Sequence, residues 1–349
     1  MSCRVAVIGA GRMGKLHARV LNDMTDVELV CVVDINQATA KAVAKQRGCK
    51  ALFDPAEAVD MVDAAVIAVP TVKHLEAARP FLEAGKSLLI EKPLADTAAA
   101  AKELLDLAQT HNASVQVGHT ERFNPAVLSM QKYDIHPKFI EAHRISPFTF
   151  RSADIGVVFD MMIHDLDLVL MMASGGVDRI DAVGVNVLGR HEDICNARLS
   201  FGDGCVANVT ASRLAIKTER KMRIFSENAY VSVDYGRKLG IVVTKEANLD
   251  LIQMARTMDL DDLAELAESV DYRSLLKIEE LTIDESVEPL RRQAEAFRRT
   301  VIEGAPPVVS AADGFAAVQL ATDIVQAVKD HPWDGQESTR KGLDILDRN

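Results

Sequence analysis

Short apolar runs alternate with amphipathic stretches over about the first 120 residues of the chain. The runs are typical of strands buried in a parallel sheet. They occupy residues 5–8, 29–33, 65–69, 88–90 and 115–117. Helices are predicted between them at residues 37–46, 72–84 and 97–111. This alternation implies right-handed crossovers and an α/β fold with a doubly wound parallel sheet, whose ligands bind beyond the carboxyl ends of the strands.

After about residue 120 the pattern predicts a different kind of domain. Short turns such as Gly202-Asp203-Gly204 are hairpin signals between predicted strands of an antiparallel sheet. These strands lie at residues 139–146, 180–189, 194–201, 205–213, 221–226 and 229–233. The acidic, partly helical segment 245–285 is interpreted as an insertion or an oligomer contact, and amphipathic helices are predicted at 288–302 and 311–329. We therefore expect a first domain at 1–120 and a second, α+β domain with an open mixed or antiparallel sheet at 121–349.

The composition is that of an ordinary globular protein and argues against several classes of function. The 349 residues are 48% apolar and 26% charged, enough for two domains with sizeable cores. The net charge of −11, with no concentrated basic stretch, argues against nucleic acid as a partner. No apolar run has the length needed to cross a bilayer, and the first strand begins too early to leave room for a signal peptide. The five scattered cysteines form no CxxC pair, so we expect reduced thiols in a cytoplasmic protein.

A glycine motif follows the first predicted strand directly, as Gly-Ala-Gly-Arg-Met-Gly at residues 9–14. Gly9 permits a tight turn, Gly11 lets backbone approach a pyrophosphate, and Gly14 lets the next helix pack on the strand. That helix would point its N-terminal amides at the phosphates, and His17 in its first turns is interpreted as structural. Asp34 ends the second strand, where its carboxylate would accept hydrogen bonds from a ribose diol and repel a 2′-phosphate. The pattern therefore predicts NAD as the cofactor.

The residues expected to contact NAD lie at the carboxyl ends of the predicted strands or in the loops that follow them. They are Gly9, Gly11, Arg12, Met13, Gly14, Asp34, Pro70, Glu91 and Lys92. Lys92, in the triplet Glu91-Lys92-Pro93, could also hydrogen-bond a substrate hydroxyl, and burial would make its proton easier to lose. A solvated lysine at a strand end is the alternative interpretation. The Lys92–Pro93 peptide bond could be cis.

A second group of chemically active side chains falls on one predicted helix. Asp160, His164 and Asp167 are spaced at i, i+4 and i+7, so they would share one face of a mostly apolar helix. A buried histidine flanked by carboxylates is the arrangement expected of a general base with an orienting partner. Half of a metal site and a satisfied core histidine are the alternatives. No further His, Asp or Glu cluster completes a ligand set, so no metal is expected.

Several arginines follow the predicted change of domain. Arg122, Asn124 and Arg144 are candidates for contact with an anionic or polyhydroxyl substrate, and Arg151 and Arg213 are weaker candidates of the same kind. Placement on the protein surface is an equal alternative for these side chains.

Together these motifs resemble the Gfo/Idh/MocA family of oxidoreductases over nearly the whole chain. The resemblance rests on the glycine motif with His17, on the Glu-Lys-Pro triplet and on the Asp-x-x-x-His helix. It implies a Rossmann domain followed by a substrate domain with an open, mixed sheet that often forms the interface of a homodimer or homotetramer. It also implies that Lys92, Asp160 and His164 stand at catalytic positions. We expect hydride transfer from a secondary sugar alcohol to NAD, with His164 as general base, Asp160 orienting it and Lys92 stabilising the oxyanion.

Two segments bear on the substrate. Residues 118–125 and 143–151 look most like those of UDP-N-acetylglucosamine 3-dehydrogenases, which oxidise a sugar-nucleotide 3-hydroxyl to a ketone for a partner aminotransferase. In similar enzymes an arginine at the place of Arg144 helps hold the substrate. This chain departs from many relatives at 154–158, where Asp-Ile-Gly-Val-Val replaces a Gly-Gly pair. A free-sugar or inositol dehydrogenase and a non-catalytic NAD-binding regulatory protein are the alternatives.

Overall fold

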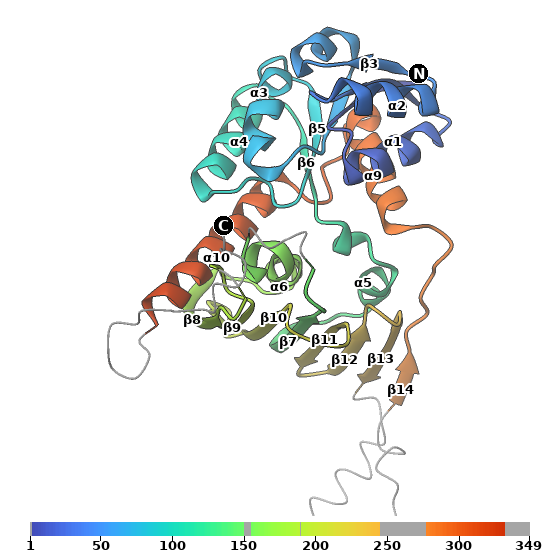
Figure 1. Ribbon diagram of the computed structural model, residues 1–349. Helices are drawn as coiled ribbons and strands as arrows, with labels where there is room; N and C mark the ends of the chain where they lie inside the picture. The colour runs from blue at the N-terminus through green and yellow to red at the C-terminus, as the bar shows by residue number, and fades with distance from the viewer. Residues whose placement is uncertain (1, 150–154, 189, 245–276, 332–349) are drawn as a thin grey trace, which may run out of the picture. The chain divides into compact units, whose positions relative to one another are not determined.

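A computed structural model describes residues 2–149, 155–188, 190–244 and 277–331 (Figure 1). These residues form two compact units, each described here by itself. Within the described ranges the first unit comprises residues 2–124, 158–170 and 286–331, and the second comprises the remainder. Arg151 and the greater part of the acidic segment, residues 245–276, lie outside the described residues.

The first unit is built on a six-stranded sheet in the order β3-β2-β1-β4-β5-β6, in which every pair of neighbours is parallel. The strands are β1 (Cys3–Ile8), β2 (Val27–Val33), β3 (Lys50–Leu52), β4 (Ala64–Ile67), β5 (Ser87–Glu91) and β6 (Val115–Gly118). The predicted doubly wound sheet is confirmed, and only the short edge strand β3 was missed. The order reverses between β1 and β4, which is where such sheets bind their ligands.

Helices cover both faces of this sheet (Figure 1). They are α1 (Arg12–Asn22), α2 (Gln37–Arg47), α3 (His74–Glu83), α4 (Ala98–Thr110), α9 (Pro289–Glu303) and α10 (Ala311–Asp330), with the 3-10 turns η1 (Pro55–Met61), η2 (Thr71–Lys73) and η3 (Thr120–Phe123). Side chains cap several of their starts: Asn36 accepts from Thr39 N, and Thr97 accepts from Ala100 N. Val7 and Leu89 of the sheet belong to one buried cluster with Phe297 of α9.

The contacts group residues 158–170 and 286–331 with residues 2–124, whereas the sequence suggested a single boundary near residue 120. Helix α9 contacts α1, and α10 contacts α4. Gly314 of α10 lies so close to Val117 of β6 that a Cβ would overlap its side chain. Amphipathic periodicity predicted both C-terminal helices, but periodicity carries no information about which apolar surface a helix covers.

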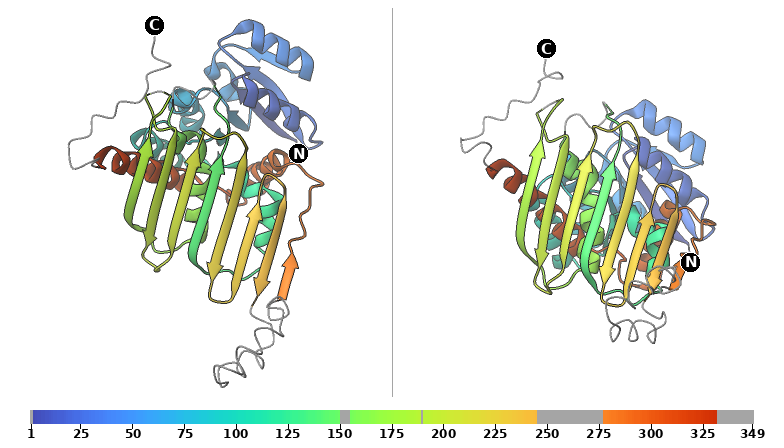
Figure 2. Two further views of the ribbon diagram at one scale, coloured as in Figure 1. Left: turned by 60° about the horizontal axis from the view of Figure 1, so that its bottom comes forward. Right: turned by 90° about the horizontal axis from the view of Figure 1, so that it is seen from below.

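The second unit is built on an eight-stranded sheet in the order β14-β13-β12-β11-β7-β10-β9-β8 (Figure 2). The strands are β7 (Pro137–Ile145), β8 (Val177–Val185), β9 (Ile194–Phe201), β10 (Val206–Ser212), β11 (Glu219–Ser226), β12 (Ala229–Asp234), β13 (Leu239–Thr244) and β14 (Lys277–Glu280). The sheet is mixed, as the resemblance implied, because β7 and β10 pair in parallel while the other neighbours are antiparallel. Strands β13 and β14 were not predicted.

One face of this second sheet is more exposed than the other. Along β9, Cys195, Ala197 and Leu199 are buried while the residues between them are exposed, which is the alternation of a half-covered sheet. Helix α5 (Pro125–Met130) contacts β12 and lies behind the strands in the left view of Figure 2.

Candidate functional site

The glycine loop after β1 has the geometry of a dinucleotide site. Gly9 has a φ of +97°, and a Cβ on it would lie 2.6 Å from the Ala68 carbonyl oxygen. A Cβ on Gly14 would overlap the carbonyl oxygen of Gly9, so the third glycine allows the close packing of α1. A Cβ on Gly11 would meet nothing within 4 Å, which leaves the backbone open on that side. The loop therefore fits the approach of a pyrophosphate to the N-terminus of α1.

Asp34 lies beside this loop at the carboxyl end of β2. Its Oδ2 accepts a hydrogen bond from the Ala10 amide at 2.7 Å, and its Oδ1 accepts one from the Asn36 amide at 2.8 Å. These bonds fix the carboxylate at the edge of the loop, where the acidic residue of NAD-binding sheets lies. The structure thus ties Asp34 to the glycine motif, which the sequence spacing of the two had only suggested.

The same edge of the sheet carries the predicted catalytic lysine. Lys92 follows β5 directly, is half-buried, and donates from Nζ to the backbone oxygen of Asp160 at 2.9 Å. The Lys92–Pro93 peptide bond is cis. Because Asp160 and His164 belong to one helical segment, this contact brings Lys92 against the segment that carries both. A freely solvated lysine, the alternative interpretation, does not agree with the contact.

The segment that carries Asp160 and His164 is helical, as the spacing predicted, but its first turn is not an α-turn. Residues Val158–Met162 form a π-helical turn, η5, and α6 (Ile163–Met172) continues from it. π-Turns within helices occur often at functional sites. Asp160 and His164 are both half-buried, so each keeps some accessible surface. The segment belongs to the first unit with Lys92.

Two buried side-chain pairs involve residues close in the chain to His164 and Lys92. Arg122 donates from Nε and Nη2 to the two carboxylate oxygens of Asp167 at 2.8 and 2.7 Å, and both side chains are buried. Asp167 lies three residues after His164, so the pair anchors the helix next to the predicted base. Arg122 was predicted to contact substrate; the structure engages its guanidinium within the fold, and the substrate contact stays a prediction.

The second pair includes Glu91, the residue directly before Lys92. His17 Nε2 of α1 lies 2.6 Å from Glu91 Oε1, and both side chains are buried. Burial alone would raise the pKa of Glu91, but the hydrogen bond and charge of His17, together with the charge of Lys92, hold that pKa below its ordinary value. Glu91 was predicted to contact NAD, and the structure assigns Oε1 a partner within the protein.

A further histidine follows β6 directly, at the carboxyl edge of the sheet where the sequence pattern placed the ligand. His119 is fully buried, and neither ring nitrogen makes a hydrogen bond with the described residues. Burial lowers its pKa, while the nearby charge of Asp167 opposes that shift and the charge of Arg122 adds to it. Burial close to the Arg122–Asp167 pair thus favours the neutral form of His119.

The remaining substrate candidates have different surroundings. Asn124 is half-buried and donates to Glu121 Oε2 at 2.9 Å. Arg144, in the second unit, is buried on the same face of β7 as Ile140 and Ala142. Their contacts with substrate stay predictions.

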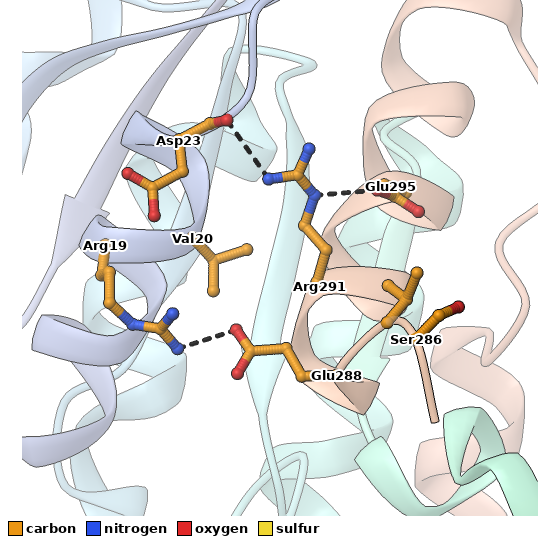
Figure 3. Close-up of a pocket in the computed structure, with 8 residues that line it drawn as sticks. Arg19, Val20, Asp23, Ser286, Glu288, Arg291 and Glu295 are labelled. Atoms are coloured by element: carbon orange, nitrogen blue, oxygen red, sulfur yellow. Dashed lines mark hydrogen bonds and ion pairs between the residues drawn. The ribbon is translucent and has the colours of Figure 1, made fainter. Parts of the chain in front are cut away.

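A surface hollow of about 310 Å³ lies between α1 and the start of α9 (Figure 3). Both arginines of its lining are bonded: Arg19 donates to Glu288, and Arg291 donates to Glu295 and to the Asp23 carbonyl oxygen. It opens at the C-terminal end of α1, whereas the glycine loop lies at the N-terminal end. The hollow is therefore separate from the candidate site.

Two family models match the chain. One, described as the oxidoreductase family with an NAD-binding Rossmann fold, matches residues 3–119, and the other, the GFO/IDH/MocA C-terminal domain, matches residues 135–232. The chain belongs to the Gfo/Idh/MocA family. It is an NAD-binding oxidoreductase, and the glycine loop with Asp34 is the part of its fold that fits the cofactor.

Relatives within the Gfo/Idh/MocA family include enzymes for sugar nucleotides and for polyols. The UDP-N-acetylglucosamine 3-dehydrogenase of Acidithiobacillus ferrooxidans is 36% identical over 233 residues, 66% of this chain and 74% of that protein. The inositol 2-dehydrogenase of Rhizobium meliloti is 25% identical over 339 residues, 94% of this chain and 97% of that protein.

Solved structures agree with the fold. UDP-N-acetylglucosamine 3-dehydrogenase GnnA from Acidithiobacillus ferrooxidans superimposes with a TM-score of 0.84 at 29% identity, covering 94% of this chain and 98% of that one. Levoglucosan dehydrogenase in complex with NADH superimposes with a TM-score of 0.79 at 20% identity, over 94% of this chain and 97% of that one, and shares the fold.

Within the described residues, no helix is long and apolar enough to span a membrane. The same residues contain no group of three or more His, Cys, Asp or Glu side chains arranged to hold a metal ion.

Proposed function

We propose that this Gfo/Idh/MocA oxidoreductase oxidises the 3-hydroxyl of UDP-N-acetylglucosamine to the 3-keto sugar. The observation that carries the proposal is the contact of Lys92 Nζ with Asp160 O, which places the lysine against the segment of Asp160 and His164 at the carboxyl edge of the Rossmann sheet. The similarity to the UDP-N-acetylglucosamine 3-dehydrogenase of Acidithiobacillus ferrooxidans, in sequence and in structure, supports this choice of substrate.

Each of the three side chains has one task in the proposed reaction. NAD, when bound, supplies the acceptor for the hydride that leaves the carbinol carbon. His164 takes the hydroxyl proton as general base, and Asp160 orients the imidazole and favours its charged form. Lys92 donates a hydrogen bond to the substrate oxygen, which stabilises the negative charge that develops there as the proton leaves. The carbinol loses one hydride and one proton and becomes a ketone.

The proposal is tested by stopped-flow measurement of NADH formation with UDP-N-acetylglucosamine. We expect turnover by the wild-type protein and a loss on the order of a hundredfold or more in His164→Ala and in Lys92→Ala, with NAD affinity retained. Lys86→Ala is the matched control, because Lys86 precedes the same strand at its amino end. Turnover at the wild-type rate in both site variants would refute the assignment.

A second candidate substrate is a free sugar or inositol, which the inositol 2-dehydrogenase of Rhizobium meliloti supports by similarity over 94% of this chain. A panel of UDP-sugars and free polyols separates the two. Activity on the free compounds alone would reject the nucleotide-sugar substrate. A protein that binds NAD and turns over no sugar would instead be the non-catalytic regulatory alternative.

The remaining predictions extend the proposal. Arg122, Asn124 and Arg144 contact the substrate, and Arg12, Met13 and Pro70 contact NAD. The protein works in the cytoplasm as a homodimer or homotetramer, and an aminotransferase consumes its ketone product. Sedimentation of the purified protein measures the oligomeric state, and an increase in the KM for substrate in Arg144→Ala measures the contribution of that arginine.

A further inference from the structure

The His17–Glu91 pair joins two parts of the first unit that have different tasks. His17 lies on α1, whose N-terminus forms the pyrophosphate side of the glycine loop, and Glu91 is the last residue of β5. The 2.6 Å contact is almost free of solvent, with side-chain exposures of 2% and 9%. A buried ion pair of this kind adds little to stability compared with apolar side chains of the same volume. Its geometry, by contrast, is well defined, since both partners are enclosed.

Glu91 in turn contacts the backbone of Lys92. Its second oxygen, Oε2, lies 3.3 Å from the Lys92 amide nitrogen. On the neighbouring strand, a Cβ on Gly118 would lie 3.0 Å from Glu91 Cα and 3.2 Å from Oε2, so glycine at that position lets β6 close on the glutamate. The carboxylate is thus held by α1 on one oxygen and confined by β6 near the other. Lys92, the next residue, extends from this fixed point to Asp160 O.

We infer that His17 and Glu91 are positioning residues that hold Lys92 in its place against the segment of Asp160 and His164. They act through the backbone of Lys92 and do not touch the reacting atoms. The inference rests on the proposed role of Lys92 in the reaction. It adds that the helix of the glycine loop is linked to the lysine through the buried His17–Glu91 contact. A change at His17 should therefore alter the position of Lys92.

The first test is a comparison of His17→Leu with His17→Gln. Leucine removes the hydrogen-bond donor, whereas the glutamine amide nitrogen can replace Nε2 as a donor to Glu91. We expect kcat to fall on the order of a hundredfold in His17→Leu, because a displacement of about 1 Å at a reacting group has an effect of that size. We expect His17→Gln to recover most of that loss and the KM for NAD to stay near the wild-type value in both.

The second test needs no substrate, so it stays valid if the proposed sugar is wrong. Reductive methylation with ¹³C-formaldehyde gives each lysine an NMR signal, and Lys92→Arg identifies the signal of Lys92 by its loss. In the wild-type protein this signal should differ from those of exposed lysines. In His17→Leu it should move toward them, and in His17→Gln it should stay close to the wild-type position.

Arg4→Gln is the matched control for both measurements. Arg4 forms an ion pair of similar length with Asp63, 2.7 Å, at the opposite end of the same sheet and in an exposed place. This variant should leave kcat and the Lys92 signal unchanged. An unmoved Lys92 signal in a folded His17→Leu protein would overturn the inference. Equal loss in His17→Leu and His17→Gln together with weakened NAD binding would overturn it as well, because the pair would then only support the nucleotide site.

Discussion

The structure has two buried arginine–aspartate pairs, one in each unit, and they are built differently. In the first unit, Arg122 bonds both oxygens of Asp167, and a second carboxylate, Asp313, lies 3.6 Å from its Nη2. In the second unit, Arg213 donates from Nε to Asp193 Oδ1 at 2.6 Å, and Asp193 is completely buried. The first arginine thus has two carboxylates within reach, and the carboxylate of the second pair is the more deeply buried of the two pairs' aspartates.

The two pairs also differ in their hydrogen bonds with the backbone. Asp193 Oδ2 accepts from the amides of Val187 and Leu188, each at 2.7 Å, and Arg213 Nη1 donates to the Ile155 carbonyl oxygen at 2.7 Å. The pair of the second unit therefore holds two loops, one of which ends three residues before η5 begins. The pair of the first unit joins side chains only. Asp193 accepts hydrogen bonds from two backbone amides as well as from Arg213, so its removal leaves more groups without their acceptor than the removal of Asp167 does.

Removal of Asp193 should have the largest effect. Asp193→Ala removes the buried carboxylate that pairs with the Arg213 guanidinium and leaves two partly buried amides without their acceptor. We expect a loss of about 3–5 kcal/mol in the free energy of unfolding, measured by urea denaturation with circular dichroism. Asp193→Asn, which keeps the size and one acceptor oxygen, should lose less. A loss below about 1 kcal/mol in Asp193→Ala, typical of an exposed pair, would remove the basis of the comparison.

Removal of Asp167 should have a smaller effect, because Asp313 partly compensates the charge of Arg122. We expect Asp167→Ala to lose about 2 kcal/mol, within the range for a buried polar group that loses its partner. The double variant Arg122→Met, Asp167→Ala leaves no unpaired charge and should be more stable than Asp167→Ala alone. The single variants Arg122→Met and Asp167→Ala complete the cycle. If their losses in the free energy of unfolding simply add in the double variant, the two residues are not coupled and the pair does not anchor the helix.

The parts of the structure that the sequence predicted are those with local signals. The glycine motif, the apolar runs of the Rossmann strands and the start of α4 after Thr97 each depend on neighbours in the chain, and each was confirmed. Asp160 and His164 were placed on one helix by their spacing. The π-turn at Val158–Met162 was not predicted, because an i, i+4 spacing has no signal for an extra residue in the turn.

The ion pairs were not predicted because their partners lie far apart in the chain. His17 and Glu91 are separated by 74 residues, and Arg122 and Asp167 by 45. A charged residue needs a partner when it is buried, but the sequence does not indicate which residue that partner is. Arg122 was a candidate for substrate contact and Arg213 a weaker one, and both are ion-paired within the fold.

The pH dependence of stability gives the smallest effect and isolates Asp193. Burial alone would raise its pKa, but the amides of Leu188 and Val187 and the charge of Arg213 hold that pKa below the ordinary value of 3.8. Since the folded protein binds this proton less readily than the unfolded chain, the stabilising contribution is present above pH 3.8 and is lost as the pH falls through the folded pKa.

Urea midpoints of the wild type should therefore fall more steeply below pH 3.8 than those of Asp193→Asn, which has no carboxylate to protonate. Glu91, Asp63 and Asp203, whose pKa values are also lowered, remain in both proteins and contribute to the pH dependence that the two share. If the urea midpoints of the two proteins change with pH at the same rate, the folded protein does not stabilise the charged form of Asp193 relative to the unfolded chain. The difference between the two arginine–aspartate pairs would then lie in packing alone.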